Sequence, residues 1–403
     1  MRPAGDGRSQ DTPAQPEEPA VLRQRMVDLL VAAGTVTDAE VERALRTVPR
    51  HLFLPGIALD QAYADIAVAT HWEGGIAVSS ASQPAIVAIM LQQLRVEPGM
   101  RVLEVGAGTG YNAALLAELV GAGGSVISLD IDPVIVAEAV EHLTAAGYSR
   151  VGAIAADGAA GWRDGAPYDR IILTVGAADV APAWVEQLAA DGVLVLPLWL
   201  GSVEASVAFR KQDGGLLGLS LAPCGFMRLR GAEAGDERWV ALPNGRKLFT
   251  DRAADIAEPV ARLLATRPRR RFWAFPGVQL VPYIGLLGHR LVTLSPPEQP
   301  FRKRRALPRW GIYAEGADGP SLVLFAPRLP LALAYGGVAA EVAVEAARET
   351  LKDQRTGAIE NWRIAARPRG TATAAPPLGA HRLVRRHFVF DIWPTQASDT
   401  NEC

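Results

Sequence analysis

Three alternating glycines follow a short apolar segment and make residues 101–111 the most informative stretch of this chain. Glu104, Gly106, Gly108 and Gly110 give the pattern E-x-G-x-G-x-G, and a predicted helix follows the last glycine. Because glycine has no Cβ, such a loop can turn sharply at the end of a β-strand and approach a ligand closely. The stretch therefore predicts a loop that binds a nucleotide-containing cofactor, although tight packing of a strand on a helix would also use these glycines.

The spacing of the glycines narrows the choice of nucleotide. A dinucleotide-binding fold favours G-x-G-x-x-G, and a phosphate-binding P-loop needs Gly-Lys followed by Ser or Thr. Neither pattern is present. A second apolar segment, residues 125–129, ends at Asp130, where an acid can accept hydrogen bonds from both hydroxyls of a ribose. A nicotinamide dinucleotide remains the alternative cofactor.

The elements around this loop alternate between strand and helix. Further strands are predicted at residues 151–156, 171–175 and 192–197, and a helix runs through Trp184. Such alternation indicates a parallel sheet with helices on both faces, that is, an α/β doubly wound, Rossmann-like fold. Helical periodicity from residue 21 to residue 48, with a Thr37-x-x-Glu40 capping box, predicts helices ahead of the sheet.

Composition limits the possible classes of protein. The chain has 403 residues, 49% of them hydrophobic, which is enough for more than one domain. A formal charge of -2 gives no general attraction to nucleic acid or membrane. Two cysteines make a disulfide framework improbable, and the first twenty residues have no apolar segment typical of a signal peptide. We therefore expect a cytoplasmic protein without a metal site, because the six histidines have no metal-ligand spacing.

The glycine pattern resembles motif I of class I S-adenosylmethionine-dependent methyltransferases. Upstream of it, residues 53–55 (Phe-Leu-Pro), 63–65 (Tyr-x-Asp) and 82–84 (Ser-Gln-Pro) resemble the N-terminal signature of protein-L-isoaspartate O-methyltransferases. Downstream, the pieces D-G-x-x-G-W, A-P-Y-D and G-x-L-V-x-P follow in the order that this family shows. The resemblance implies S-adenosylmethionine as cofactor and a peptide or protein carboxylate as methyl acceptor.

The resemblance also implies roles for individual residues. Ser82 corresponds to a hydroxyl beside the transferred methyl group and the substrate carboxylate, although Ser82 could simply cap the helix that begins near Pro84. Glu104 is expected near the methionine end of the cofactor, Asp130 at the ribose and Asp157 near the adenine; the alternative for Glu104 and Asp157 is a structural acid. The full predicted cofactor set is Glu104, Gly106, Ala107, Gly108, Thr109, Gly110, Asp130, Ile131, Asp157 and Gly158. The predicted substrate set is Ser80, Ser82, Gln83, Val175 and Gly176.

Methylation of a carboxylate needs little acid-base catalysis, because the nucleophile is already ionised at neutral pH. The protein must instead align the reactants and exclude water. An esterified aspartyl or isoaspartyl side chain is an electrophile, so attack by the next backbone nitrogen should give a succinimide (aspartimide) with loss of methanol.

Two features depart from the housekeeping form of the family. The segment 66–81 is several residues longer, at the place where peptide substrate should enter, and about 170 residues follow Arg230. We divide the chain into a disordered tail (1–20), an N-terminal helical and substrate-loop region (21–95), the S-adenosylmethionine-binding core (96–230) and a C-terminal α+β accessory domain expected to recognise peptide (231–403).

The C-terminal region carries predicted helices at 252–265 and 338–352 and predicted strands at 310–314, 322–326 and 383–393. Basic segments at 267–271, 302–305 and 385–386 could bind an acidic peptide or a nucleic acid, or could form a solvated surface.

We favour modification of a dedicated, ribosomally made peptide, as in family variants with similar extensions, over general repair of isoaspartyl damage. An RNA methyltransferase is a remoter hypothesis, because no Asn-Pro-Pro-aromatic element is present. A catalytically inactive binding scaffold is another, and the intact glycine loop argues against it.

Overall fold

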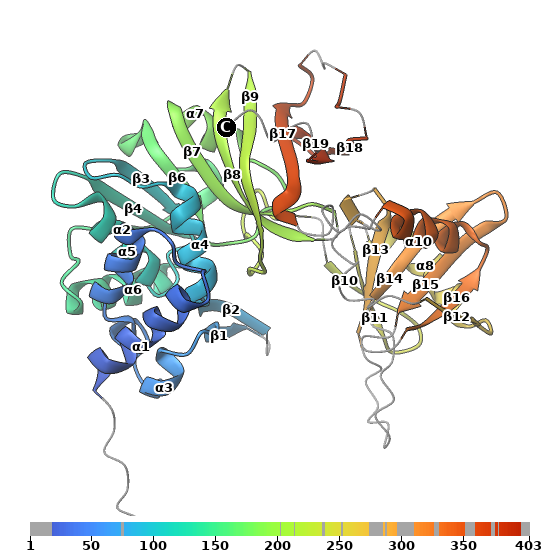
Figure 1. The fold of residues 1–403 in the computed structure, drawn as a ribbon, viewed down its shortest axis with the longest axis horizontal. Helices are drawn as coiled ribbons and strands as arrows, with labels where there is room; N and C mark the ends of the chain where they lie inside the picture. The colour runs from blue at the N-terminus through green and yellow to red at the C-terminus, as the bar shows by residue number, and fades with distance from the viewer. Residues whose placement is uncertain are drawn as a thin grey trace, which may run out of the picture.

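The computed structural model describes residues 18–73, 76–201, 203–212, 214–235, 238–250, 253–273, 285–286, 288–295, 310–325, 330–350, 359–371, 375–377 and 379–395. These residues form two large sheets that lie side by side as separate lobes, and a small hairpin beside the N-terminal helices (Figure 1).

The N-terminal helices form one group ahead of the sheets. Their bounds are α1 Pro19–Ala32, α2 Ala39–Thr47, η1 Arg50–Phe53 and α3 Leu59–Ala62. Helix α1 begins two residues inside the predicted tail. The N-cap of α2 is Asp38, whose carboxylate accepts hydrogen bonds from the backbone N–H groups of Glu40 and Val41, and not Thr37 of the predicted capping box. Thr37 instead donates to the Oε1 of Gln92.

The segment expected as a long substrate loop is a β-hairpin. Strands β1 (Val68–Glu73) and β2 (Ile76–Ala81) pair antiparallel with an irregular register near His71. The hairpin leads into α4 (Pro84–Leu94), the first helix of the core.

The larger sheet has ten strands in the order β18-β19-β17-β9-β8-β7-β6-β3-β4-β5. Its first seven strands in sequence are β3 Arg101–Val105, β4 Ser125–Asp130, β5 Gly152–Ala155, β6 Tyr168–Leu173, β7 Leu188–Trp199, β8 Glu204–Gln212 and β9 Gly215–Pro223. Strands β3 to β7 pair in parallel, and the remaining pairs are antiparallel. The predicted doubly wound α/β fold is confirmed.

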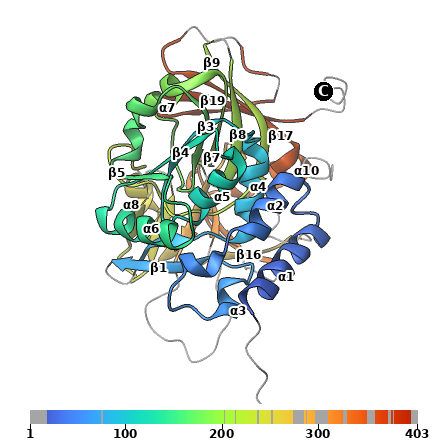
Figure 2. The same cartoon turned by 90° about the vertical axis from the view of Figure 1, so that its left-hand side faces the viewer.

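Helices cover both faces of this sheet (Figures 1 and 2). The connecting helices are α5 Tyr111–Val120, α6 Pro133–Ala145, η2 Gly158–Ala160, η3 Arg163–Gly165 and α7 Pro182–Gln187. Successive side chains of a strand point to opposite faces. Accordingly Val102 of β3 packs in the hydrophobic cluster that holds α4 and α5, whereas Leu103 and Val105 pack in the cluster that holds Trp184 of α7.

The smaller sheet has seven antiparallel strands in the order β10-β11-β13-β14-β15-β16-β12. The bounds are β10 Arg238–Ala241, β11 Lys247–Thr250, α8 Ala253–Leu264, β12 Arg269–Phe272, β13 Arg290–Leu294, β14 Trp310–Gly316, β15 Gly319–Phe325, β16 Leu331–Gly336 and α10 Ala339–Thr350. Helices α8 and α10 pack in separate hydrophobic clusters with different strand residues, one on each face of the sheet. The mixed α+β character predicted here is confirmed.

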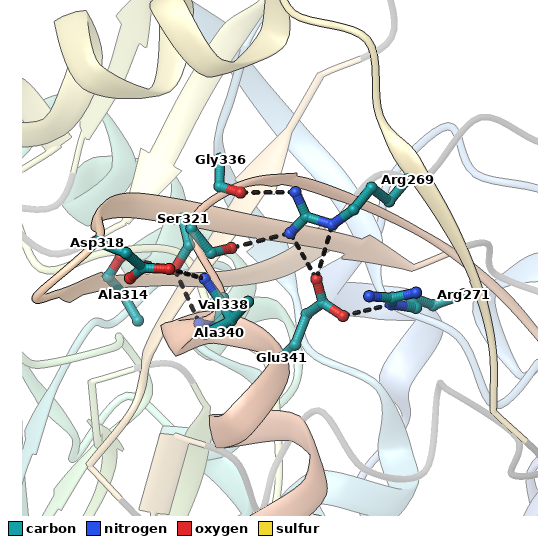
Figure 3. Close-up of polar contacts among 10 residues, drawn as sticks. Arg269, Arg271, Ala314, Asp318, Ser321, Gly336, Val338, Ala340 and Glu341 are labelled. Atoms are coloured by element: carbon teal, nitrogen blue, oxygen red, sulfur yellow. Dashed lines mark hydrogen bonds and ion pairs between the residues drawn. The ribbon is translucent and has the colours of Figure 1, made fainter.

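Side chains from the smaller sheet hold the N-terminus of α10 (Figure 3). Asp318 accepts from the Val338 N–H at 2.9 Å, and the Ser321 hydroxyl accepts from the Ala340 N–H at 2.8 Å. In the first turn Glu341 forms ion pairs with Arg269 and Arg271 of β12. The edge strand β12 is thereby fixed to the helix as well as to β16.

The end of the chain returns to the larger sheet, which differs from the single C-terminal unit expected for 231–403. The last elements are η5 Ile359–Asn361, β17 Trp362–Pro368, β18 His381–Val384 and β19 Phe388–Pro394. Strand β17 pairs with β9, and buried side chains such as Trp362 and Phe390 join the hydrophobic cluster of the larger sheet. The single strand predicted at 383–393 is a hairpin. Periodicity reveals strands but not their distant partners, which explains the difference.

The three basic segments lie in different settings. Residues 269–271 belong to β12, and 302–305 lie outside the described residues. Arg385 donates to the Trp199 carbonyl, and Arg386 lies 3.6 Å from Glu233, so these two arginines make contacts within the protein.

Within the described ranges, every helix falls short of the length and apolar character needed to cross a membrane. No grouping of His, Cys, Asp and Glu suited to a metal ion occurs among the same residues.

Candidate active site

A cavity of about 660 Å³ lies at the carboxyl ends of β3, β4 and β6, where open α/β sheets bind their ligands. The glycine loop, Asp130 and the end of β6 form one side, and the hairpin with the start of α4 forms the other. A third wall comes from residues 223–227, which follow β9. The lining residues are Ala67, Val78, Ser79, Ser80, Ala81, Ser82, Gln83, Ile86, Val87, Gly106, Ala107, Gly108, Thr109, Tyr111, Asn112, Asp130, Thr174, Val175, Pro223, Cys224, Gly225, Phe226 and Met227.

The glycine loop has the backbone geometry that its sequence predicts. Gly106, Gly108 and Gly110 all have positive φ, at 103°, 51° and 87°. A Cβ on Gly106 would lie 2.7 Å from the Oγ1 of Thr174, so close approach as well as φ requires glycine there. Gly110 precedes α5 and packs toward Leu143, away from the cavity.

Asp130 faces the cavity with its carboxylate already oriented by backbone groups. One oxygen accepts from the Gly108 N–H and the other from the Asp132 N–H, each at 3.2 Å. The sequence therefore places this acid correctly at the cavity. Its neighbour Ile131 is exposed and does not line the cavity.

Glu104 lies beneath the glycine loop and does not line the cavity, contrary to the position expected near the methionine end of a cofactor. Its side chain is fully buried and accepts hydrogen bonds from Asn112 Nδ2 at 2.7 Å and from Ser128 Oγ at 2.6 Å. Burial raises the pKa of this carboxyl group to about 7, and the two hydrogen bonds oppose the shift. Because Asn112 does line the cavity, Glu104 contacts the site through it.

Asp157 and Gly158 also lie outside the cavity lining. The Asp157 carboxylate accepts from the backbone N–H groups of Ala159 and Ala232, at 2.9 and 2.8 Å. The Gly158 carbonyl accepts from the indole of the buried Trp184. These contacts match the structural alternative that the sequence left open for Asp157.

The predicted substrate residues Ser80, Ser82, Gln83 and Val175 all line the cavity, and Val175 lies directly against Gly106 of the glycine loop. Gly176 does not; its N–H donates to the Met227 carbonyl.

Ser82 is not the N-cap of α4. That position is Gln83, which forms no side-chain cap. Instead Asp65, distant in sequence, accepts from the Ala85 N–H at 2.8 Å and from the Gln83 amide at 2.9 Å. The hydroxyl of Ser82 is therefore not committed to capping the helix.

A buried arginine supports the acceptor side of the cavity. Arg50 donates from Nε to the Ala62 carbonyl and from Nη2 to the Ser82 carbonyl, both at 2.9 Å. Its guanidinium lies over the ring of Tyr111, 4.8 Å from the centroid. Desolvation lowers the pKa of Arg50, but an arginine remains charged. Ala62 and Ser82 flank the hairpin, so Arg50 holds both of its ends.

Several residues that line the cavity were not predicted from the sequence. Tyr111, Asn112 and Thr174 adjoin predicted residues, and their positions next to the glycine loop and strand β6 were the available signal. Residues 223–227 carry no motif, and only the return of the chain after β9 brings them to the site. Burial raises the pKa of the Cys224 thiol, which therefore stays protonated near neutral pH.

The residues that line the cavity fit a cationic sulfonium ligand. They include the Asp130 carboxylate and the aromatic side chains of Tyr111 and Phe226, and no lysine, arginine or histidine.

Residues 22–234 match the family model of protein-L-isoaspartate(D-aspartate) O-methyltransferase (PCMT). The chain belongs to this family. It is therefore an S-adenosylmethionine-dependent protein carboxyl methyltransferase, and the resemblance of its motifs to this family is confirmed at that level.

Curated relatives agree. The protein-L-isoaspartate O-methyltransferase of Methanococcoides burtonii is 42% identical over 188 residues, which are 47% of this chain and 88% of the relative. That of Methanopyrus kandleri is 38% identical over 225 residues, covering 53% of this chain and 94% of the relative.

A solved structure titled protein-L-isoaspartate O-methyltransferase shares the fold, at 24% identity and a TM-score of 0.51. The match covers 85% of this methyltransferase and 96% of that chain, so the similarity in fold extends beyond residues 22–234.

Proposed function

We propose that the methyltransferase esterifies an aspartyl or isoaspartyl side chain of a peptide, whose carboxylate enters the cavity from the Ser82 side. One observation carries the proposal: Ser82 lines the same cavity as Asp130 and the glycine loop. A methyl donor held by the loop and an acceptor held near Ser82 would therefore meet inside a single enclosed space.

In this proposal the residues of the chain act by binding and alignment. S-adenosylmethionine supplies an electrophilic methyl group when it is bound. Asp130 accepts hydrogen bonds from the ribose hydroxyls, and Gly106 to Thr109 allow the backbone to approach the donor. The Ser82 hydroxyl orients the acceptor carboxylate, which is already ionised and needs no general base. The hairpin and residues 223–227 exclude water from the acceptor oxygen.

For the acceptor we favour a dedicated, ribosomally made peptide, in which the methyl ester collapses to an aspartimide and then gives isoaspartate. The hairpin β1–β2 supports this choice, because residues 78–81 of its strand β2 line the cavity. General repair of isoaspartyl protein remains the alternative. The C-terminal region alone favours neither the dedicated peptide nor general repair, because the solved structure titled protein-L-isoaspartate O-methyltransferase matches 85% of this chain.

We also propose that the smaller sheet recognises peptide, through the edge of β12 that pairs with no other strand among the described residues. This strand ends the sheet order, and all four of its residues are exposed. Arg269 and Arg271 are paired with Glu341, whereas Arg270 lies on the other face together with Phe272, which is 75% exposed. An extended peptide can add to such an edge, and an acidic residue on it would suit Arg270. The alternative is that the charged edge of β12 binds no peptide and only prevents aggregation.

In the first experiment, the 403-residue enzyme and S-adenosylmethionine are incubated with two peptides of the same sequence, one with aspartate and one with isoaspartate. Mass spectrometry follows the methyl ester and the succinimide that forms when methanol leaves. Efficient turnover of an arbitrary isoaspartyl peptide would remove the case for a dedicated substrate. Failure of every peptide despite donor binding would remove the acceptor assignment itself.

The second experiment tests the edge of β12. We expect an acidic extension far from the methylated residue to lower the KM of a peptide for the parent enzyme, and to have no effect on the Arg270→Glu variant. Arg262→Glu, on the exposed face of α8, is the matched control. If the extension lowered the KM equally in the parent, Arg270→Glu and Arg262→Glu, peptide recognition by β12 would be contradicted.

A further inference from the structure

Arg230 connects the β1–β2 hairpin with the carboxylate at the end of β4. Its Nη1 lies 3.4 Å from Oε1 of Glu73, the last residue of β1, and its Nη2 lies 3.9 Å from Oδ1 of Asp130. The Asp130 side chain is 12% exposed and that of Glu73 is 65% exposed. One guanidinium therefore spans from the surface of the hairpin to an acid inside the cavity.

Among the described residues, the two strands of the hairpin make few polar side-chain contacts with the rest of the protein. Its base is held by Arg50, but β1 and β2 form a sheet of two strands that pairs with no other described strand. Among the described residues near the turn, Glu73 forms an ion pair with Arg230, and Nε2 of His71 is in hydrogen-bond contact with Oε1 of Glu138 in α6 at 3.3 Å. The position of the hairpin over the cavity therefore depends on side-chain contacts at these points.

Asp130 can take part in this contact and still bind a ligand. At 3.9 Å the separation from Arg230 is too long for a hydrogen bond, so the interaction is a screened ion pair. Each carboxylate oxygen accepts one long backbone hydrogen bond and keeps a further acceptor site. A hydroxyl donor such as a ribose diol would thus find both oxygens available while Arg230 stays in place.

We propose that Arg230 is a positioning residue for methyl transfer, which holds the hairpin closed over the bound donor by bridging Glu73 and Asp130. The proposal rests on the assignment of the ribose to Asp130. Hairpin residues such as Val78, Ser79 and Ser80 form part of the cavity lining, so a displaced hairpin would leave the donor exposed and free to depart. Coupling between hairpin and donor is reciprocal, so donor binding also stabilises the closed hairpin.

The test measures binding of S-adenosylhomocysteine, which needs no methyl acceptor. Variants Arg230→Gln, Glu73→Gln and the double variant are compared with Arg163→Gln, an exposed arginine paired with Glu186 away from the cavity. We expect the first two to dissociate S-adenosylhomocysteine about two- to fivefold faster, the range of a partly exposed ion pair. The double variant should be no faster than either single variant, because both break the same bridge.

Hydrogen exchange separates this role from a purely structural one. In the parent enzyme, added S-adenosylhomocysteine should slow exchange of the amides in β1 and β2, and this protection should be reduced in Arg230→Gln. Arg230→Lys should restore only part of it, because an ammonium group is a single point charge and cannot reach two carboxylates as a guanidinium does.

Three outcomes would overturn the proposal: tighter binding in Arg230→Gln, additive effects of the two single variants, or unchanged hairpin protection. Tighter binding would mean that Arg230 competes with the ribose. Asp130→Asn distinguishes these results from failure of the proposed function. If that variant binds S-adenosylhomocysteine normally, the ribose assignment is wrong and the bridge through Asp130 falls with it.

Discussion

At the scale of single residues, Ser82 is the side chain whose removal should separate chemistry from donor binding. In Ser82→Ala we expect kcat to fall about a hundredfold, because the acceptor carboxylate loses the group that orients it. The dissociation constant for S-adenosylmethionine should stay unchanged, since in the proposed function the glycine loop and Asp130 hold the donor and Ser82 does not. Initial rates and calorimetry measure the two quantities, with Ser125→Ala at the start of β4 as control. A normal kcat would leave Ser82 without a role in the reaction.

Glu104 should make stability depend on pH. Its pKa is raised from 4.5 to about 7 by burial, so the folded protein holds a proton that the unfolded chain releases between these values. The stabilisation from the protonated form is complete below pH 4.5 and is lost as pH rises through 7, by on the order of 3 kcal/mol. Urea unfolding from pH 5 to pH 8 should show this loss, and Glu104→Gln should abolish it. The same pH dependence of the free energy of unfolding in the parent and in Glu104→Gln would contradict the raised pKa of Glu104.

At the scale of elements, Arg50 should determine whether the hairpin has a fixed base. Arg50→Met keeps the apolar volume but leaves the buried carbonyls of Ala62 and Ser82 without their donors. We expect a loss of about 2–4 kcal/mol in the free energy of unfolding, the cost of unsatisfied buried acceptors. Urea unfolding measures it. Arg50→Lys, whose ammonium group can reach one carbonyl, should have a free energy of unfolding between those of the parent and Arg50→Met. Equal stability of Arg50→Met and the parent would contradict a stabilising role for these hydrogen bonds.

Elements that are specified locally could be predicted from the sequence. The glycine loop needs positive φ at three positions, and Asp130 follows directly from the end of its strand, so both were placed at the cavity correctly. Their binding roles remain proposals. Contacts between distant segments could not be predicted: the cap that Asp65 provides to α4 and the wall from residues 223–227 depend on tertiary packing. The burial of Glu104 outside the cavity lining could not be predicted either, because a motif gives the position of a residue, not the direction of its side chain.

At the scale of the whole molecule, the chain leaves the methyltransferase sheet after β9, builds a second sheet and then returns. Side chains join the lobes: Trp199 packs edge-to-face against Phe249 of β11, and Leu286 is buried in the core of the larger sheet. The returning strands β17 to β19 extend that sheet beyond β9 and cover its edge. An uncovered β9 would present unpaired backbone groups, which promote aggregation. The last described residues therefore belong to the catalytic sheet.

This topology predicts that a residue far from the active site in sequence controls the stability of the donor-binding core. Trp362 is 1% exposed and shares a hydrophobic cluster with Leu103 and Val105, which precede the glycine loop. Trp362→Ala should lower the free energy of unfolding by about 3–5 kcal/mol, because it leaves a cavity at the Trp362 site within this cluster. S-adenosylhomocysteine raises the melting temperature of the unit that binds it, so it identifies the transition of the larger sheet.

We expect Trp362→Ala to lower that ligand-sensitive transition, as followed by calorimetry with and without S-adenosylhomocysteine. The matched control is Trp273→Ala, because Trp273 packs in the core between the smaller sheet and α10. It should lower the transition of the smaller sheet and affect the ligand-sensitive one less. Two results would contradict this prediction: a larger decrease of the ligand-sensitive transition temperature in Trp273→Ala than in Trp362→Ala, or no decrease in Trp362→Ala. Either result would mean that strands β17 to β19 do not unfold together with the donor-binding core. Any effect of the C-terminal region on the stability of the donor-binding core would then come only from the contacts between the two lobes.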